Sequence, residues 1–360
     1  MRISSGLVLT AMALLLQAAP AQAEVKVIEA ANVYRMGDND SRNDARRICI
    51  QEAKRRALEL AGTYVSSLTQ VRDFRLTMDE VTSYTAGMIA TDIVSEEMRG
   101  SAEHPEIVVK VRCSIDTSVL LKQLGSFREN DELKAQLEAA ARENEKLRKE
   151  RDALIATMQG EKDKAKAEET RKQVSAVLSR QEGNDETMKY WRRLSTRVYD
   201  PAQHVDDAEL AEATASLTRI ANADPANGRA RFLLASIYQR GKDYVAAERE
   251  IRSALEFSPN DPFLHLKLGA LLKLDGKYDA SLQELLIAEK GLGDHPSVLF
   301  NLSTAYYHLD NCTRATDYAR RYFERIKRGD KPVNESMKKR AGQVLKNCDR
   351  GELEGPRRRR

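Results

Sequence analysis

The chain has 360 residues, enough for two or three domains that each bury a core. Charged residues make up 32% of it and aromatic residues 6%, a balance that favours long helices with solvated faces over an α/β enzyme. The net charge is only +4 and acidic and basic residues interleave, which argues against an extended nucleic-acid-binding stripe. We therefore expect a multidomain, mainly α protein that does not bind nucleic acid.

Residues 1–23 are predicted to be a secretory signal peptide. Arg2 gives the positive start, residues 7–16 form a short apolar run, and Ala21-Gln22-Ala23 gives the cleavage pattern. The apolar run is too short for a permanent membrane anchor, and no second long apolar run follows. We expect a mature protein that begins at Glu24 and resides in a bacterial periplasm without a transmembrane anchor.

Residues 24–125 are predicted to form a small α+β domain. Apolar and polar residues alternate from Glu106 to Asp116, which predicts a half-buried strand. Residues 25–28 and 91–98 are weaker strand candidates.

Two capping patterns predict the helices of this domain. Ser41 followed by Asp44 opens a helix to about Ala61, with Gly62 as its stop. Thr77 followed by Glu80 opens a second helix, which we expect to end near Met88.

The same domain resembles a known family. The motifs that carry the resemblance are Tyr34-x-Met36-Gly37-Asp38, Ala53-Lys54-Arg55, Ala61-Gly62-Thr63-Tyr64-Val65, Leu76-Thr77-x-Asp79-Glu80 and the strand from Ile107. They resemble the N-terminal domain of flagellar assembly protein T, over about the first third of the mature chain. Similar domains occur in exported bacterial proteins with varied C-terminal parts. The resemblance implies an α+β fold and, as one alternative, a flagellar basal-body role.

Residues 129–158 are predicted to be a coiled coil through which the chain forms a dimer or trimer. Two sets of heptad positions define the seam: Leu133, Ala140, Leu147 and Leu154 at d, and Leu137, Asn144, Arg151 and Met158 at a. A polar Asn at an a position fixes register and strand number. The heptads fail after Gly160, so residues 159–184 are predicted to be a charged helical linker.

From residue 228 the chain repeats with a period of 34, in blocks that begin at Gly228, Pro262 and Pro296. Several columns agree: Leu234, Leu268 and Leu302; Ala235, Gly269 and Ser303; Ala247, Ser281 and Ala315. This pattern resembles the tetratricopeptide repeat, a helix-turn-helix unit that stacks into an α-solenoid. We predict an array over residues 185–349 with a degenerate first repeat, whose second helix is 206–223, and a capping helix at 331–347. A basic tail, 350–360, follows.

The resemblance implies that the first helix of each repeat lines a concave groove that binds a protein or peptide segment. The implied groove residues are Arg229, Phe232, Ser236, Gln239, Arg240, Phe263, Leu266, Ala270, Lys273, Leu274, Ser297, Phe300, Thr304, Tyr307 and His308. Phe232, Leu266 and Phe300 share one column and would form an apolar ladder for a peptide. The alternative is that a neighbouring segment of the same chain covers this ladder. The Lys and Asn pattern of a carboxylate clamp is absent, so recognition of a chain-terminal carboxylate is not expected.

The four cysteines are expected to form disulfides, in keeping with an oxidising compartment. Cys312 sits at the turn just before the second helix of the third repeat, and Cys348 follows the end of an antiparallel capping helix of equal length, about 16 residues, so the two should meet. The alternative is two free thiols. Cys49 and Cys113 face the same core and are a weaker pair that could also stay unbonded.

No catalytic cluster, cofactor or metal site is predicted. The five histidines are scattered without metal-ligand spacing. The leading hypothesis is a non-enzymatic periplasmic scaffold in cell-envelope assembly, which self-associates through its coiled coil and binds proteins through its repeats. The alternatives are a flagellar basal-body accessory factor and an enzyme hidden in the N-terminal domain.

Overall fold

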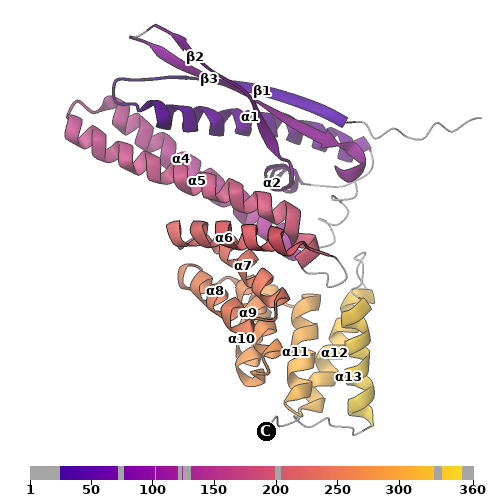
Figure 1. Cartoon of the computed structure of the whole chain (residues 1–360). Helices are drawn as coiled ribbons and strands as arrows, with labels where there is room; N and C mark the ends of the chain where they lie inside the picture. Colours follow the sequence, from indigo (N-terminus) through magenta and orange to yellow (C-terminus); the bar gives the residue numbers. More distant parts are fainter. Residues whose placement is uncertain are drawn as a thin grey trace, which may run out of the picture.

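The computed structural model describes residues 25–71, 77–101, 103–120, 124, 131–198, 204–327 and 335–350. The chain is mainly helical, with a small sheet near its N-terminus and stacked helical repeats towards its C-terminus (Figure 1). The predicted signal peptide and nearly all of the basic tail lie outside the described residues.

Three antiparallel strands form the sheet, in the order β1-β3-β2. They are β1 (Val25–Arg35), β2 (Thr91–Gly100) and β3 (Pro105–Asp116). The alternation predicted for β3 is confirmed, because Ile107, Val109 and Val111 are buried between more exposed neighbours. β1 is longer than the predicted 25–28, since it pairs with β3 over its whole length. Its extent is therefore set by its partner strand.

Helix α1 (Arg42–Val71) covers one face of the sheet (Figure 1). Its buried stripe recurs every four residues and consists of small side chains, Cys49, Ala53, Ala57 and Ala61, which allow a close approach to the strands. The predicted stop at Gly62 is wrong. Ala61 and Val65 keep the stripe going, and Gly62 faces Thr85 of the next helix, so packing outweighs the cost of about 1 kcal/mol for a helical glycine.

Helix α2 (Met78–Met88) begins with the predicted capping box. The Glu80 amide donates to Thr77 Oγ1 at 3.2 Å, and the Thr77 amide donates to Glu80 Oε2 at 2.7 Å. Near its end, a Cβ placed on Gly87 would lie 2.3 Å from Leu137 Cδ2. A larger residue at position 87 would force Leu137, on the helix over residues 131–160, to shift.

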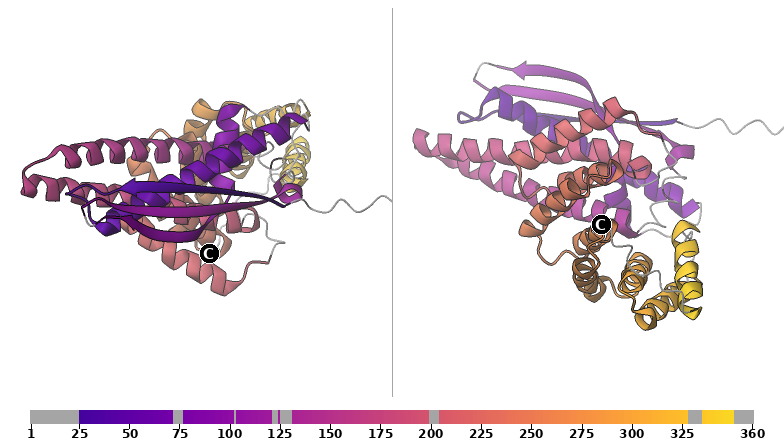
Figure 2. Two further views of the ribbon diagram at one scale, coloured as in Figure 1. Left: turned by 90° about the horizontal axis from the view of Figure 1, so that it is seen from above. Right: turned by 60° about the horizontal axis from the view of Figure 1, so that its bottom comes forward.

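Two long helices, α4 (Asp131–Gly160) and α5 (Lys164–Val198), form an antiparallel hairpin. Figure 2 shows them side by side along much of their length. The predicted coiled-coil seam is therefore intramolecular: Leu137, Ala140 and Leu147 are at most 4% exposed within a single chain. Heptads do not distinguish a second copy from a second helix, and a three-residue connection makes closure within the chain inexpensive.

The remaining seam positions also find partners in the same chain. Arg151 is 2% exposed and pairs with Glu52 of α1, and Met158 is buried. Leu154 packs beside Leu178 of α5. The side chain of Leu133 lies outside the described residues.

The predicted charged helical linker, 159–184, is helical from Lys164 onwards, but there it forms the start of α5 and packs on the rest of the protein. Val174, Val177 and Leu178 are at most 3% exposed and face the hairpin and α1. The abundant charges that suggested a linker lie on the other sides of the helix. A narrow stripe of buried apolar residues is enough to pack this helix against its neighbours.

The repeat region contains a regular series of helices. They are α6 (Asp207–Ala223), α7 (Gly228–Arg240), α8 (Tyr244–Phe257), α9 (Pro262–Leu274), α10 (Tyr278–Leu292), α11 (Pro296–His308), α12 (Cys312–Lys327) and α13 (Glu335–Asp349). The starts of α7, α9 and α11 confirm the 34-residue period, and α8, α10 and α12 keep the same spacing. The end of α5 and α6 act as the degenerate first repeat against α7. The capping helix α13 is described from Glu335, and the first four residues predicted for it, 331–334, lie outside the described residues.

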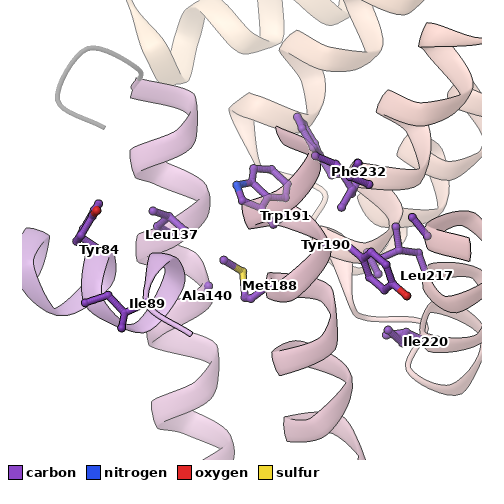
Figure 3. Close-up of a cluster of buried hydrophobic side chains, with 14 of the residues drawn as sticks. Tyr84, Ile89, Leu137, Ala140, Met188, Tyr190, Trp191, Leu217, Ile220 and Phe232 are labelled. Atoms are coloured by element: carbon purple, nitrogen blue, oxygen red, sulfur yellow. The ribbon is translucent and has the colours of Figure 1, made fainter. Parts of the chain in front are cut away.

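One hydrophobic core joins the sheet, the hairpin and the first repeats (Figure 3). Its labelled side chains run from Tyr84 of α2 through Leu137 of α4 and Trp191 of α5 to Phe232 of α7. The ring centroids of Trp191 and Phe232 are 5.8 Å apart. The array is therefore packed on the hairpin rather than tethered to it.

Three asparagines reinforce this junction. Asn184 of α5 donates to Asn144 Oδ1 of α4 at 2.9 Å and accepts a hydrogen bond from Asn227 Nδ2 at 2.9 Å. Asn227 also caps α7 by accepting from the Ala230 amide at 3.0 Å. Asn144, predicted to fix the register between two copies, instead connects the hairpin to the repeats.

Cys312 and Cys348 are joined by a disulfide with a Cα–Cα distance of 5.4 Å, the pairing expected from the equal helix lengths. The weaker pair is not bonded. Cys49 Sγ lies 3.2 Å from the carbonyl oxygen of Ile107, whereas Cys113 is six residues farther along β3, roughly 20 Å away. Both thiols are buried and too far apart to react.

Candidate partner-binding surface

The apolar ladder predicted for the groove is part of the core. Phe232 is 0% exposed, and Leu266 and Phe300 are each 5% exposed. Trp191 of α5 packs on Phe232, and Tyr322 of α12 packs beside Phe300 with ring centroids 6.2 Å apart. The prediction of an open ladder is wrong, because neighbouring segments of the same chain cover these rings.

Two lysines of α9 lie over the two phenylalanine rings. Lys267 Nζ is 5.1 Å from the centroid of Phe232, and Lys273 Nζ is 4.8 Å from that of Phe300. Both lysines are nearly buried, at 7% and 9% exposed. Two nearly buried ammonium groups therefore cover the rings that the sequence predicted to be open to a partner.

Each lysine also bridges two repeats by a hydrogen bond between residues 28 apart. Lys267 Nζ donates to Gln239 Oε1 at 2.8 Å, and Lys273 Nζ donates to Asn301 Oδ1. In both cases the twelfth residue of one repeat meets the sixth residue of the next. Lys273 donates in addition to Thr304 Oγ1 at 3.0 Å.

Lys273 has an unusual electrostatic environment. Among the described residues, no carboxylate lies within ion-pair distance of its ammonium group. Burial and then the like charge of Arg340 on α13 lower the pKa of Lys273 to about 7. A buried cation held only by neutral groups is costly, so this lysine weakens the fold that contains it.

The other predicted groove residues separate into buried and accessible ones. Arg229 is 8% exposed, its Nε has no hydrogen-bond partner, and burial lowers its pKa to about 10. Ser236 and Tyr307 are buried and hydrogen-bonded, to the Phe232 carbonyl and to Asn347. Leu274 is 42% exposed. The partly exposed residues are Gln239, Arg240, Phe263, Ala270, Ser297 and His308.

Lys273 and the residues around it, of which Thr304 is also buried, define what we call the C-terminal groove. Its members are Ala270, Lys273 and Leu274 of α9, Thr304 and His308 of α11, and Arg340 of α13. His308 is fixed by stacking on Tyr278, with ring centroids 4.4 Å apart. Arg340 is exposed. This surface combines an apolar contact, a buried cation and an exposed cation.

Sequence reasoning missed Lys267, Asn301 and Arg340. Lys267 and Asn301 share the sixth position of their repeats, which the family pattern of groove residues omits. A signal was present, because both interrupt first helices that are otherwise mostly apolar. Arg340 reaches the groove only through the fold of the capping helix.

Residue types that can ligate a metal occur throughout the described residues. No group of three or more His, Cys, Asp or Glu side chains is placed to hold a metal there. A shallow depression of about 320 Å³ lies between α1 and β2. It is bordered by Arg46 and Glu96, which form an ion pair of 2.5 Å across it. Within the same described ranges, no helix has the length and apolar character needed to cross a membrane.

Two comparisons with known proteins bear on the repeats. A family model of the tetratricopeptide repeat matches residues 204–272. The chain is also 34% identical over 131 residues to bacteriophage adsorption protein A of Escherichia coli strain K12, an alignment that covers 36% of this chain and 12% of the relative. This chain thus spans about an eighth of that relative's length. The comparisons and the helix spacing show that the chain contains tetratricopeptide repeats, a module that generally binds proteins.

Proposed function

We propose that the chain is a non-enzymatic scaffold of the bacterial cell envelope that binds a protein partner in its C-terminal groove. The observation that carries the proposal is Lys273, a nearly buried cation without a carboxylate among the described residues, beside the exposed Leu274. Such a costly group on a repeat surface is explained by a partner that neutralises it. The shared core gives this surface a rigid base on the hairpin and sheet.

We place the protein in the periplasm. The pattern in residues 1–23 supports export, and the disulfide between Cys312 and Cys348 suits an oxidising compartment. The proposal does not include self-association through the heptads, because their apolar residues are buried within one chain in the hairpin.

The N-terminal domain would contact a second envelope component. Its small sheet with one covering helix is compatible with the resemblance to the N-terminal domain of flagellar assembly protein T. A flagellar role is not favoured, because the matches concern tetratricopeptide repeats and a phage adsorption protein. We therefore retain the envelope scaffold without the flagellar assignment.

Site-specific photo-crosslinking in the periplasm tests the proposal. Leu274 on α9 and Ile287 on α10 are both 42% exposed, but only Leu274 lies on a first helix of a repeat. A benzophenone amino acid at position 274 should give a discrete protein adduct, and the same group at 287 should not. Absence of an adduct at 274, or equal adducts at both positions, would contradict the proposal.

A further inference from the structure

We infer that Lys273 binds a side-chain carboxylate of an acidic partner segment that lies in the C-terminal groove. The inference rests on the proposed function and adds the chemistry of the partner. It starts from the contacts of one ammonium group. Two of its three hydrogens are directed to neutral oxygens, those of Asn301 and Thr304, and its charge lies over the ring of Phe300. When the amine is protonated, its third hydrogen and its charge remain for a ligand.

Several more exposed cations of the repeats have carboxylate partners, although the buried Arg229, like Lys273, has no ion pair among the described residues. Arg231 pairs with Glu250 at 3.1 Å, Lys277 with Glu248 at 2.9 Å, and Arg321 with Glu289 at 3.0 Å. These cations are more exposed than Lys273 and still have carboxylate partners. The most deeply buried lysines need a counter-charge most, so the missing anion at Lys273 points to one supplied from outside.

The charge around Lys273 has the sign that would attract this anion. Arg340 of α13 is exposed and close enough to lower the pKa of Lys273 by repulsion. A carboxylate between the two would relieve that repulsion and pair with both cations. Two like charges that act on each other favour an anion over any neutral group.

The residues beside the nearly buried Lys273 are small or exposed. Ala270 lies one turn before it, is partly exposed and carries only a methyl group. Leu274, the next residue, is 42% exposed and offers an apolar contact to the backbone of a bound segment. A short Asp or Glu side chain can enter here while the rest of its segment stays on the surface.

The donors favour a side-chain carboxylate over the end of a chain. Terminal carboxylates are usually held by several converging donors. Here the amide of Asn301 already donates to the Ser297 carbonyl at 2.7 Å, and the Thr304 hydroxyl is 3.0 Å from the Phe300 carbonyl. The ammonium group and Arg340 remain, which suits one carboxylate of an acidic segment.

Peptide binding tests the inference. The probe is a fluorescent 12-residue peptide of alternating Glu and Ala with acetylated and amidated ends, titrated with the full mature chain at low salt. The controls are the matching Gln-Ala peptide and the same Gln-Ala peptide with a free C-terminus. We expect only the Glu peptide to bind. Equal binding of the free-ended Gln peptide would overturn the choice of a side-chain carboxylate.

Two matched variants locate the binding. Lys273→Met should weaken binding of the Glu peptide roughly 30-fold, about 2 kcal/mol. Lys290→Met removes the same charge from an exposed position on α10 and should leave binding unchanged. Equal binding by the two variants would overturn the inference. Thermal unfolding of each variant verifies that it is folded.

Two further outcomes separate this inference from the proposed function. If the adduct at Leu274 persists in Lys273→Met at wild-type yield, the scaffold stands and the carboxylate inference is wrong. If no adduct forms at Leu274 in the wild type, the proposed function itself fails. A chain that ends at Arg350 tests whether Glu352 and Glu354 occupy the groove in cis. Much tighter peptide binding after this truncation would overturn an external partner as the natural occupant.

Discussion

Phe232 and Phe300 occupy the same repeat position at opposite ends of the array, yet their surroundings differ. Phe232 lies against Trp191 in a core that continues through the hairpin to the sheet. Phe300 belongs to a separate core of the last repeats, under a lysine without a carboxylate partner among the described residues. The first end of the array is thus used to attach the repeats. The second end keeps a charge that the fold itself does not need, which is where we place the partner.

The largest effect should come from removing the two rings. Phe232→Ala and Phe300→Ala should each cost about 3–5 kcal/mol of unfolding free energy, because both create cavities in packed cores. Trp191 is the only tryptophan, so its fluorescence reports on the first end alone. Urea unfolding should show a changed native emission in Phe232→Ala and an unchanged one in Phe300→Ala. A changed emission in Phe300→Ala would mean that the two ends are not separate.

Loss of the disulfide should affect the second end only. Cys312→Ser with Cys348→Ser opens a loop of 36 residues, worth about 3–4 kcal/mol from loop-closure entropy. Hydrogen exchange should then accelerate in α13 and remain slow in α7. Equal acceleration in both helices would show that the capping helix supports the whole array.

A smaller effect is expected at the asparagine junction. Asn184→Leu leaves Asn144 Oδ1 and Asn227 Nδ2 without their partner, at a cost of about 1–3 kcal/mol. Gln173→Leu, an exposed change on the same helix, is the matched control and should be nearly neutral. Equal urea midpoints for the two variants would contradict the claim that the asparagine junction stabilises the protein.

The features that could be predicted from the sequence depend on local pattern. The 34-residue period, the capping box at Thr77 and the approach of Cys312 to Cys348 follow from helix geometry and short-range spacing. The features that could not be predicted depend on which surfaces of the protein pack against each other. Heptads do not reveal that α5 is their partner, and a repeat pattern does not reveal that Trp191 covers Phe232.

The candidate site shows the same limit. Lys273 was expected in the groove, but its burial, its neutral partners Asn301 and Thr304 and the nearby charge of Arg340 depend on two later helices. Its charge was visible in the sequence. The cost of that charge in folding free energy was not visible in the sequence, because burial is a property of the assembled repeats.

The thermal unfolding of Lys273→Met at two pH values tests the central claim most directly. The pKa of Lys273 is lowered to about 7 in the fold, by burial and by Arg340, so the unfolded chain binds more protons between that pH and the ordinary lysine pKa. The cost of the buried charge is therefore full below pH 7 and fades as the pH rises. We predict that Lys273→Met unfolds at a higher temperature than the wild type, with a larger gain at pH 6 than at pH 9, while Lys290→Met changes neither. A lower midpoint for Lys273→Met at both pH values would show that the lysine stabilises the array, and would contradict the claim that it is kept for a partner.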